Sequence, residues 1–299
     1  MNTWAYLPYF GDEFTPLDEV WHRTFHRLMF RGSRWPLRLV LPLLSGERGR
    51  TSAEFIRRIR KDLDALLEQD VRNVKAGYYP KSALRFDLPS YIYSMLASGP
   101  LDGVRVLQRA KQNNWKELPL HADKNAYPDY YLRTFHWQTD GWFSEESAKR
   151  YDFTVQFLFG GVADVMRRMA LPPIAKTIST NNNVKILELA CGTGSFIPQI
   201  QAAFPKARIV GVDLSPDYIQ YARKHIKGTK VQFFHENAEH LSFENESFDA
   251  VICNNLFHEL PPQVRRKIFS EVHRVLKNNA VFSITDSLQL GDNPNMNDS

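Results

Sequence analysis

The residues best suited to chemistry lie in one stretch, where a short apolar run leads into a turn of small residues and then into a predicted helix. The run at residues 184–189 is typical of a buried strand and carries one acid, Glu188, near its end. Gly192 and Gly194 follow, and neither has a side chain to keep a ligand away from the backbone. A strand, a glycine turn and a helix in this order predict a ligand-binding turn.

A second acid stands where the next strand is expected to end. Residues 208–213 form another apolar run, and its last residue, Asp213, lies 19 residues beyond Gly194. In a strand–helix–strand unit, the acid at the end of the second strand accepts hydrogen bonds from a ribose diol. The spacing fits a nicotinamide dinucleotide site and an S-adenosylmethionine (SAM) site equally well.

The turn itself separates these two cofactors. A dinucleotide site requires a third glycine, and here that position is Ile197. Residues 188–194 instead resemble motif I of the class I SAM-dependent methyltransferases, with Ala190 in place of the family's first glycine. Three later stretches resemble further motifs of that family in the expected order: residues 212–216, 236–239 and 248–261.

The resemblance implies SAM as the cofactor, and no metal ligand is expected. It narrows further, because residues 148–152 are similar to the segment that precedes motif I in the ubiquinone/menaquinone C-methyltransferases and their small-molecule relatives. In that group the tyrosine region packs over SAM. The SAM-binding residues implied here are Tyr151, Glu188, Ala190, Gly192, Thr193, Gly194, Asp213, Leu214, Asn237, Ala238 and Asn254.

Length and periodicity predict an α/β protein with a Rossmann-like domain at residues 146–299 and a mostly helical region at residues 1–145. At 299 residues and 43% apolar content, the chain is long enough for about two domains. The predicted sheet is parallel with strand order 3-2-1-4-5, because each connection is long enough for a right-handed helical crossover. The family's usual last two strands are missing after Asp286, so a truncated chain and a shortened sheet both stay open.

Helix signals dominate the N-terminal region. A helix is predicted from Pro16, with Leu17, Val20, Trp21, Thr24, Phe25 and Leu28 on one face and a stop at Gly32. Residues 34–44 are interpreted as a buried connection, with peripheral membrane contact as the alternative. A capping box at residues 51–54 opens a helix to about Asp70, and shorter helices are expected near residues 89–97 and 102–112.

Residues 127–143 hold seven aromatic side chains without a clean period. An aromatic stretch with interspersed polar groups suits a lid over a small-molecule pocket, and a plug between domains is an equal alternative. The substrate-binding residues predicted from this stretch and from the loop after the fourth strand are Tyr131, His136, Trp137 and Glu259. His136 and His258 are expected to face each other across the pocket.

Methyl transfer from a sulfonium is an in-line displacement, in which a protein mainly orients the reactants and excludes water. A general base is optional, and the candidate is His258. A histidine that only packs at a helix start is the alternative.

The helix that precedes motif I is expected to begin at Ser144, to break at the two glycines at 160–161 and to resume up to the prolines at 172–173.

We therefore predict methyl transfer from SAM to a small-molecule acceptor, and the sequence leaves an aromatic or lipophilic acceptor open. A SAM-binding or regulatory protein without turnover is a second hypothesis because of the missing strands. A nicotinamide-dependent oxidoreductase is a third, and Ile197 argues against it.

Charge and composition limit the kinds of binding partner that the sequence predicts. Residues 1–150 hold 23 Lys and Arg against 18 Asp and Glu, whereas residues 151–299 hold 15 of each. The densest basic run, residues 57–61, alternates with apolar residues at helical spacing and predicts a solvated helix face, so no nucleic-acid partner is expected. No apolar run approaches a membrane span and the N-terminus has no targeting pattern, which predicts a cytoplasmic protein. Cys191 and Cys253 are interpreted as small fillers, and the oligomeric state is not predicted.

Overall fold

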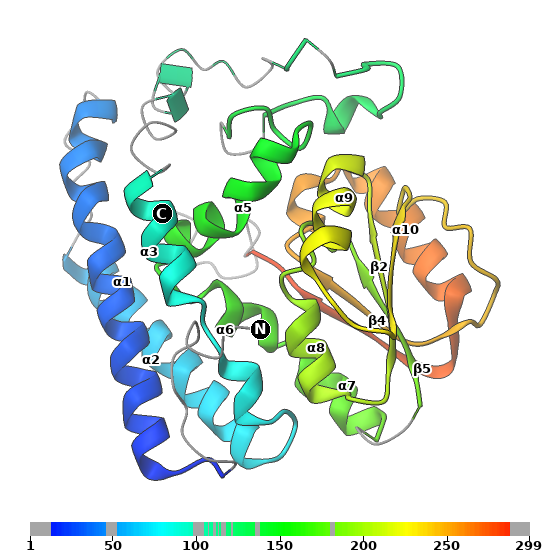
Figure 1. The fold of residues 1–299 in the computed structure, drawn as a ribbon, viewed down its shortest axis with the longest axis horizontal. Helices are drawn as coiled ribbons and strands as arrows, with labels where there is room; N and C mark the ends of the chain where they lie inside the picture. Colours follow the sequence, from blue (N-terminus) through cyan, green and yellow to red (C-terminus); the bar gives the residue numbers. More distant parts are fainter. Residues whose placement is uncertain are drawn as a thin grey trace.

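The computed structural model describes residues 13–45, 53–97, 122–134, 138–179 and 183–287, with short pieces between residues 105 and 120. A group of helices lies beside a Rossmann-like α/β half, with α5 and α6 between them (Figure 1). His136, Trp137 and much of the helix predicted at 102–112 lie outside the described residues. The predicted facing of His136 and His258 therefore stays a prediction.

A five-stranded parallel sheet forms the α/β half. Its strands are β1 (Lys185–Leu189), β2 (Arg208–Asp213), β3 (Val231–His235), β4 (Phe248–Asn254) and β5 (Leu276–Thr285). The order β3-β2-β1-β4-β5 and the parallel pairing confirm the predicted fold class. The chain leaves β1 toward β2 and later crosses to β4, so a crevice is expected at the carboxyl ends of these strands.

Helices cover both faces of this sheet because the strand side chains alternate between them. Ile186 packs on the face covered by α7 (Leu171–Thr177), α8 (Ile197–Ala203) and α9 (Pro216–His225). Leu187 and Leu189 pack on the opposite face, against α10 (Pro262–Val275). Both cysteines are buried in these two clusters, as expected of fillers.

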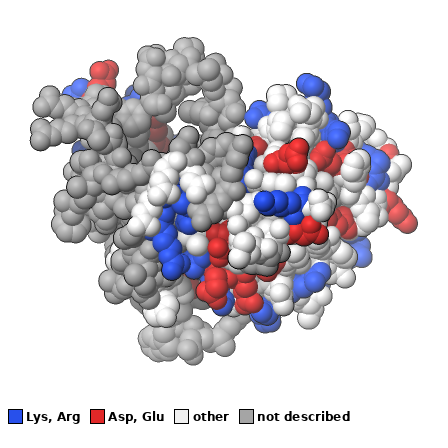
Figure 2. Space-filling view, turned by 90° about the horizontal axis from the view of Figure 1, so that it is seen from above, with Lys and Arg blue, Asp and Glu red and all other residues white. Residues whose placement is uncertain are grey.

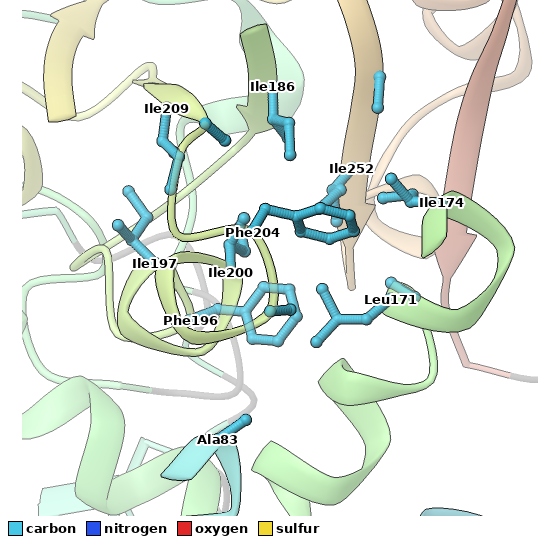
Figure 3. Packing of buried hydrophobic residues seen from close by; sticks show 14 of the residues in the cluster. Ala83, Leu171, Ile174, Ile186, Phe196, Ile197, Ile200, Phe204, Ile209 and Ile252 are labelled. Carbon is cyan, nitrogen blue, oxygen red and sulfur yellow. The ribbon is translucent and has the colours of Figure 1, made fainter. Parts of the chain in front are cut away.

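The first of these clusters continues into the N-terminal region. A short 3-10 helix, η1 (Lys81–Leu84), places Ala83 and Leu84 in the same apolar cluster as Phe196. Figure 3 shows Ala83 approaching Phe196 and Leu171 from the side away from the sheet. The two halves thus share buried apolar surface, and the division proposed at residue 145 stays a prediction.

The first helix differs from its prediction in length and in orientation. Helix α1 (Pro16–Ser45) continues through Gly32, where an added Cβ would meet nothing within 4 Å. A single glycine costs a helix only about 1 kcal/mol, too little to stop it. The predicted stop, and the connection expected at residues 34–44, were therefore wrong.

The predicted apolar face of α1 was also wrong in part. Leu17 is 81% exposed and Leu28 is 59% exposed, whereas His22 and His26 are fully buried. Only Phe25 of the predicted face is buried. The face of α1 that carries His22 and His26 is buried instead, because these histidines contact Asp70 and the Gly161 carbonyl elsewhere in the chain.

The other helices that precede the sheet begin closer to the positions predicted from the sequence than α1 agrees with its prediction. Helices α2 (Ala53–Lys75) and α3 (Leu88–Ala97) form where expected, although α2 runs five residues past Asp70. Ser144 caps α5 (Glu145–Leu158) by accepting a hydrogen bond from the backbone N–H of Ser147. The prolines at 172–173 do not end a helix: α6 (Ala163–Arg168) ends earlier and α7 begins with them, because proline is tolerated in a first helical turn.

One buried ion pair joins the N-terminal helices to the α/β half. The Asp70 carboxylate on α2 accepts two hydrogen bonds from the Arg168 guanidinium on α6, at 2.6 and 3.1 Å, and both side chains are buried. His22 Nε2 lies 3.0 Å from the same carboxylate, and the hydroxyl of Tyr79 donates to it. Burial alone would raise the pKa of Asp70, but the pairing with Arg168 and the bond from His22 hold this pKa below its usual range. Arg168 also donates to Gln199 on α8, so the network reaches the sheet's own helix layer.

Asp70→Asn should lower the free energy of unfolding by about 3–5 kcal/mol, because it leaves the Arg168 charge buried without a counter-ion. The matched control is Asp64→Asn on the same helix, whose pair with Arg27 is half exposed and should contribute at most about 1 kcal/mol. Urea denaturation of the parent and both variants measures the difference. Equal losses for the two variants would contradict the role given to the buried pair.

Candidate functional site

A cleft opens at the carboxyl ends of the strands and encloses about 800 Å³ of empty space, its mouth included. The structure brings most of the predicted site residues to its wall. Those that line it are Tyr131, Tyr151, Ala190, Gly192, Asp213, Leu214, Asn237, Ala238, Asn254 and Glu259. Glu188, Thr193 and Gly194 belong to the strand end and turn beside this wall.

The turn after β1 is held in a left-handed backbone conformation. Gly192 has φ +55° and Gly194 has φ +72°. A Cβ at Gly194 would also lie 3.0–3.1 Å from Phe233 and Ile226, so glycine is required there on two grounds. Ala190, which departs from the family pattern, has φ +54° and carries the strain that the usual glycine avoids.

Asp213 fixes this turn to the end of β2. Its carboxylate accepts hydrogen bonds from the backbone N–H groups of Gly192 and Ser215, each at 2.8 Å. Burial raises the pKa of Asp213 above its ordinary value, although these bonds oppose the shift. The side chain is half-buried and lines the cleft, so its carboxylate can also accept hydrogen bonds from a bound diol.

Two further polar side chains hold atoms with no hydrogen-bond partner among the described residues. Glu188 is 4% exposed, its Oε2 has no such partner, and burial raises its pKa to about 8. Both amide atoms of Asn254 are buried without such a partner, on the cleft wall. Buried polar atoms of this kind are rare in folded proteins, and at a cleft they indicate groups that a ligand satisfies.

Arg167 is a site residue that the sequence reasoning missed. This buried guanidinium donates to Asp164 and to the hydroxyl of Ser195 just beyond the glycine turn, at 3.1 Å each. Next to it, Thr193 donates to the Asp152 carboxylate at 2.8 and 3.0 Å. Two consecutive arginines in a short helix carry no signal that one faces Asp70 and the other faces the turn.

An aromatic strap crosses the cleft; we use this name for residues 127–143, of which 127–134 and 138–143 are described. Its Tyr130 hydroxyl donates to Glu239 after β3 at 2.8 Å. Its Arg133 donates to Glu259 at 2.9 Å, and its Trp142 carbonyl accepts from Ser215 at 2.6 Å. The strap thus contacts the loops that follow β2, β3 and β4.

The side chains of the strap divide between the cleft and the buried interior. Tyr130, Tyr131 and Trp142 line the cleft, whereas Phe143 is buried and stacks edge-on against Tyr131. Trp142 also packs edge-on against Tyr151, the residue predicted to cover the cofactor. Some side chains of the strap therefore form part of the cleft wall, and Phe143 is part of the buried core.

His258 lies between two carboxylates. Its Nδ1 is 2.6 Å from Asp286 Oδ1, and its Nε2 is 3.2 Å from Glu259 Oε1. The hydrogen bonds to Asp286 and then to Glu259 raise the pKa of His258 to about 9. An imidazolium has no lone pair to accept a proton, so this geometry gives no support to the predicted base at neutral pH.

Comparisons with known proteins agree with this site. Residues 186–279 match the family model described as "Methyltransferase domain". The chain is 36% identical over 112 residues to malonyl-[acyl-carrier protein] O-methyltransferase from Bacillus anthracis, covering 36% of this chain and 41% of that protein. It is 32% identical over 136 residues to demethylmenaquinone methyltransferase from Chlorobaculum tepidum, covering 44% and 53%. The chain therefore spans about half the length of the curated relatives it matches.

Among solved structures, the PH0226 protein from Pyrococcus horikoshii is 34% identical and covers 40% of this chain and 55% of its own. Its TM-score is 0.35.

The parallel sheet, the glycine turn and the domain match together define a class I SAM-dependent methyltransferase domain, with SAM as its cofactor. The curated relatives that the chain matches include demethylmenaquinone and ubiquinone/menaquinone C-methyltransferases, the group that the motifs resemble. The residues present fit this cofactor, since Asp213, Gly192 of the glycine turn and the unsatisfied Asn254 amide line one crevice, and the unsatisfied Glu188 Oε2 belongs to the strand that ends beside it.

Two features are absent from the described residues: a metal-binding cluster and a helix that could span a membrane. The His, Cys, Asp and Glu side chains of these residues form no group of three or more that could hold a metal ion. No helix among them combines the length and apolar character needed to cross a membrane.

The folded-state pKa of His258, about 9, lies above the ordinary value of 6.5, so its pairing stabilises the fold fully below pH 6.5 and is lost as pH rises through 9. The free energy of unfolding should therefore fall between about pH 6.5 and 9.5. The fall should be smaller in Asp286→Asn, which removes the larger cause of the shift. An NMR titration, with His258→Gln to assign the signal, measures the pKa directly; a midpoint near 6.5 in the parent would contradict the pairing.

Proposed function

We propose that this chain transfers the methyl group of SAM to a small-molecule acceptor that binds between the strap and the loop after β4. The observation that best supports this proposal is a single cleft at the switch point of the sheet. Asp213, the glycine turn and the unsatisfied Asn254 amide all lie on its wall. In the proposal, residues 146–299 hold the cofactor and residues 1–145 contribute the strap and the acceptor side.

The adenosine end of SAM is assigned to the β2 and β3 loops. The Asp213 carboxylate would accept hydrogen bonds from both ribose hydroxyls. Leu214 and Ala238 offer apolar surface to the adenine, and Asn237 lies beside them on the same wall. Tyr130, held by Glu239, would close this end from above.

The methionine end is assigned to the polar residues around the turn. Its ammonium group suits the carboxylates of Glu188 and Asp152, whereas its carboxylate suits the Arg167 guanidinium. A cation beside Glu188 would also lower the raised pKa of that side chain. Asn254 can both donate and accept, so its amide fits either group.

When bound, SAM supplies a methyl group on a sulfonium, an electrophile that needs only an aligned nucleophile. The chain's own contribution is orientation and the exclusion of water. Tyr131, Trp142 and Tyr151 present aromatic rings to the cleft and keep its inner part apolar. With His258 held as a cation, the acceptor would have to arrive as a competent nucleophile rather than be deprotonated by that residue.

The relatives leave the acceptor open. One is named for a malonyl group on acyl-carrier protein and the other for demethylmenaquinone, which are chemically different. The aromatic strap is compatible with the aromatic or lipophilic acceptor considered from the sequence.

Asp213→Asn should weaken binding of SAM and of S-adenosylhomocysteine roughly 10- to 150-fold, which corresponds to losing a charge-assisted hydrogen bond of about 1.5–3 kcal/mol. The control is Asp249→Asn, at the opposite edge of the same sheet, where Asp249 accepts from the backbone N–H of Lys185. Calorimetric titration measures both, with NADH as a ligand that should not bind.

Unchanged SAM affinity in a folded Asp213→Asn protein would overturn the cofactor assignment. Incubation of the parent with SAM and a cell extract then tests turnover. Formation of S-adenosylhomocysteine supports the enzyme, whereas tight SAM binding without it favours the binding protein without turnover.

A further inference from the structure

Helix α1 carries a row of apolar side chains that stays exposed in the folded chain. We call this row the outer stripe; its members are Leu17, Val20, Trp21, Thr24 and Leu28. Its four apolar members range from 41% exposed for Trp21 to 81% for Leu17. At the helical repeat of 3.6 residues per turn, all five members fall within about 100° around the helix axis. The buried His22 and His26 lie on the other side of α1.

The outer stripe lies at the periphery of the molecule. Figure 1 shows α1 running along the side of the helical group that is farthest from the sheet. Apolar side chains that are scattered singly on a surface need no explanation, whereas a continuous stripe on one helix face indicates an interaction surface. We therefore looked for the partner that its residues fit.

The charged side chains beside the outer stripe are already paired within the chain. Arg23 lies 2.7 Å from Glu19 and 2.9 Å from Glu68. Arg27 lies 2.8 Å from Asp64 on α2. A partner that covers the stripe therefore does not have to neutralise these arginines.

Two exposed charges of opposite sign mark the ends of the outer stripe. Glu13 stands just before the first residue of α1, and Arg31 lies about one turn beyond Leu28. Neither side chain has an ion-pair partner among the described residues. The stripe is thus apolar along its length, negative at its start and positive at its end.

A second copy of α1 fits this pattern when the two helices pack antiparallel. With the twofold axis between residues 22 and 23, Leu17 lies at the height of Leu28 of the second copy. The large Trp21 lies at the height of the small Thr24 of the second copy. Glu13 comes within about 1.5 Å, the rise of one residue, of the height of Arg31 of the second copy. Each of these contacts occurs twice, as a twofold interface requires.

We propose that the outer stripe is the interface of a homodimer in which two α1 helices pack antiparallel. The apolar side chains supply the buried area, and the pairs of Glu13 with Arg31 at both ends fix the orientation and the register. This inference does not depend on the proposed methyl transfer.

A lipid bilayer is the other surface that an apolar helix face with a tryptophan can meet. Helices that lie on membranes are rich in Lys and Arg on their polar face. In α1 that face is buried in the protein, and Arg23 and Arg27 are paired with acids. Glu13 would also be repelled by an anionic membrane. The observations therefore favour a second copy of the chain.

Sedimentation equilibrium of the full chain tests this interface. The parent should dimerise, and Leu17→Glu and Leu28→Lys should each weaken association roughly tenfold or more, because each places a charge in an apolar contact. The double variant should regain most of this loss, since its two opposite charges face each other only in the antiparallel arrangement. The matched control is Leu158→Glu at the end of α5, which is 53% exposed and should leave association unchanged.

All three positions are more than half exposed in a single chain, so circular dichroism should show the helix content of the parent in every variant. A parent that stays monomeric would overturn the proposal, and so would a dimer that neither single variant weakens. Loss of association in both single variants without recovery in the double variant would refute the antiparallel arrangement. Binding of a monomeric parent to phosphatidylglycerol vesicles, abolished in Leu17→Glu, would assign the outer stripe to a membrane instead.

Discussion

A hydrogen bond from the backbone N–H of Gly192 to the Asp213 carboxylate joins the turn after β1 to the end of β2. The turn can reach this acid only because residues 190, 192 and 194 adopt left-handed backbone angles. This hydrogen bond fixes two residues of the cleft wall, Gly192 and Asp213, relative to each other. Ala190 shows how firmly it is imposed, since an alanine is held at φ +54° where glycine would avoid the strain.

Two adjacent arginines connect this turn to the rest of the molecule. Arg167 donates to Ser195 beyond the turn, and Arg168 forms the buried pair with Asp70 on α2. Because both lie on α6, the buried pair with α2 helps to set the position of a side chain at the glycine turn. On the face of the molecule drawn in Figure 2, the described residues show acidic and basic groups interspersed rather than one sign of charge.

Sequence reasoning succeeded where a local pattern determines the structure. The apolar runs at residues 184–189 and 208–213 predict the strands β1 and β2, and the spacing of Asp213 from the glycine turn predicts the acid of the cleft, because both depend on neighbouring residues or on a fixed spacing. Ser144 is a helix cap for the same reason.

It failed where the partner is distant in the chain. The buried His26 lies 2.9 Å from the carbonyl of Gly161, 135 residues away, so no period within α1 reveals which face is buried. The contact of Arg133 with Glu259 spans 126 residues, and Arg167 reaches Ser195 over 28. Composition pointed to the strap as an aromatic segment, but only the fold shows which loops it touches.

The central claim is that the cofactor cleft is completed by the strap from the N-terminal half. Hydrogen–deuterium exchange of the full chain, with and without saturating S-adenosylhomocysteine, tests it most directly. The account predicts slower amide exchange both in the turn at residues 190–194 and in the strap at residues 127–134, with helix α2 unchanged. Slower exchange in the turn alone, with the strap exchanging as in the free protein, would contradict it.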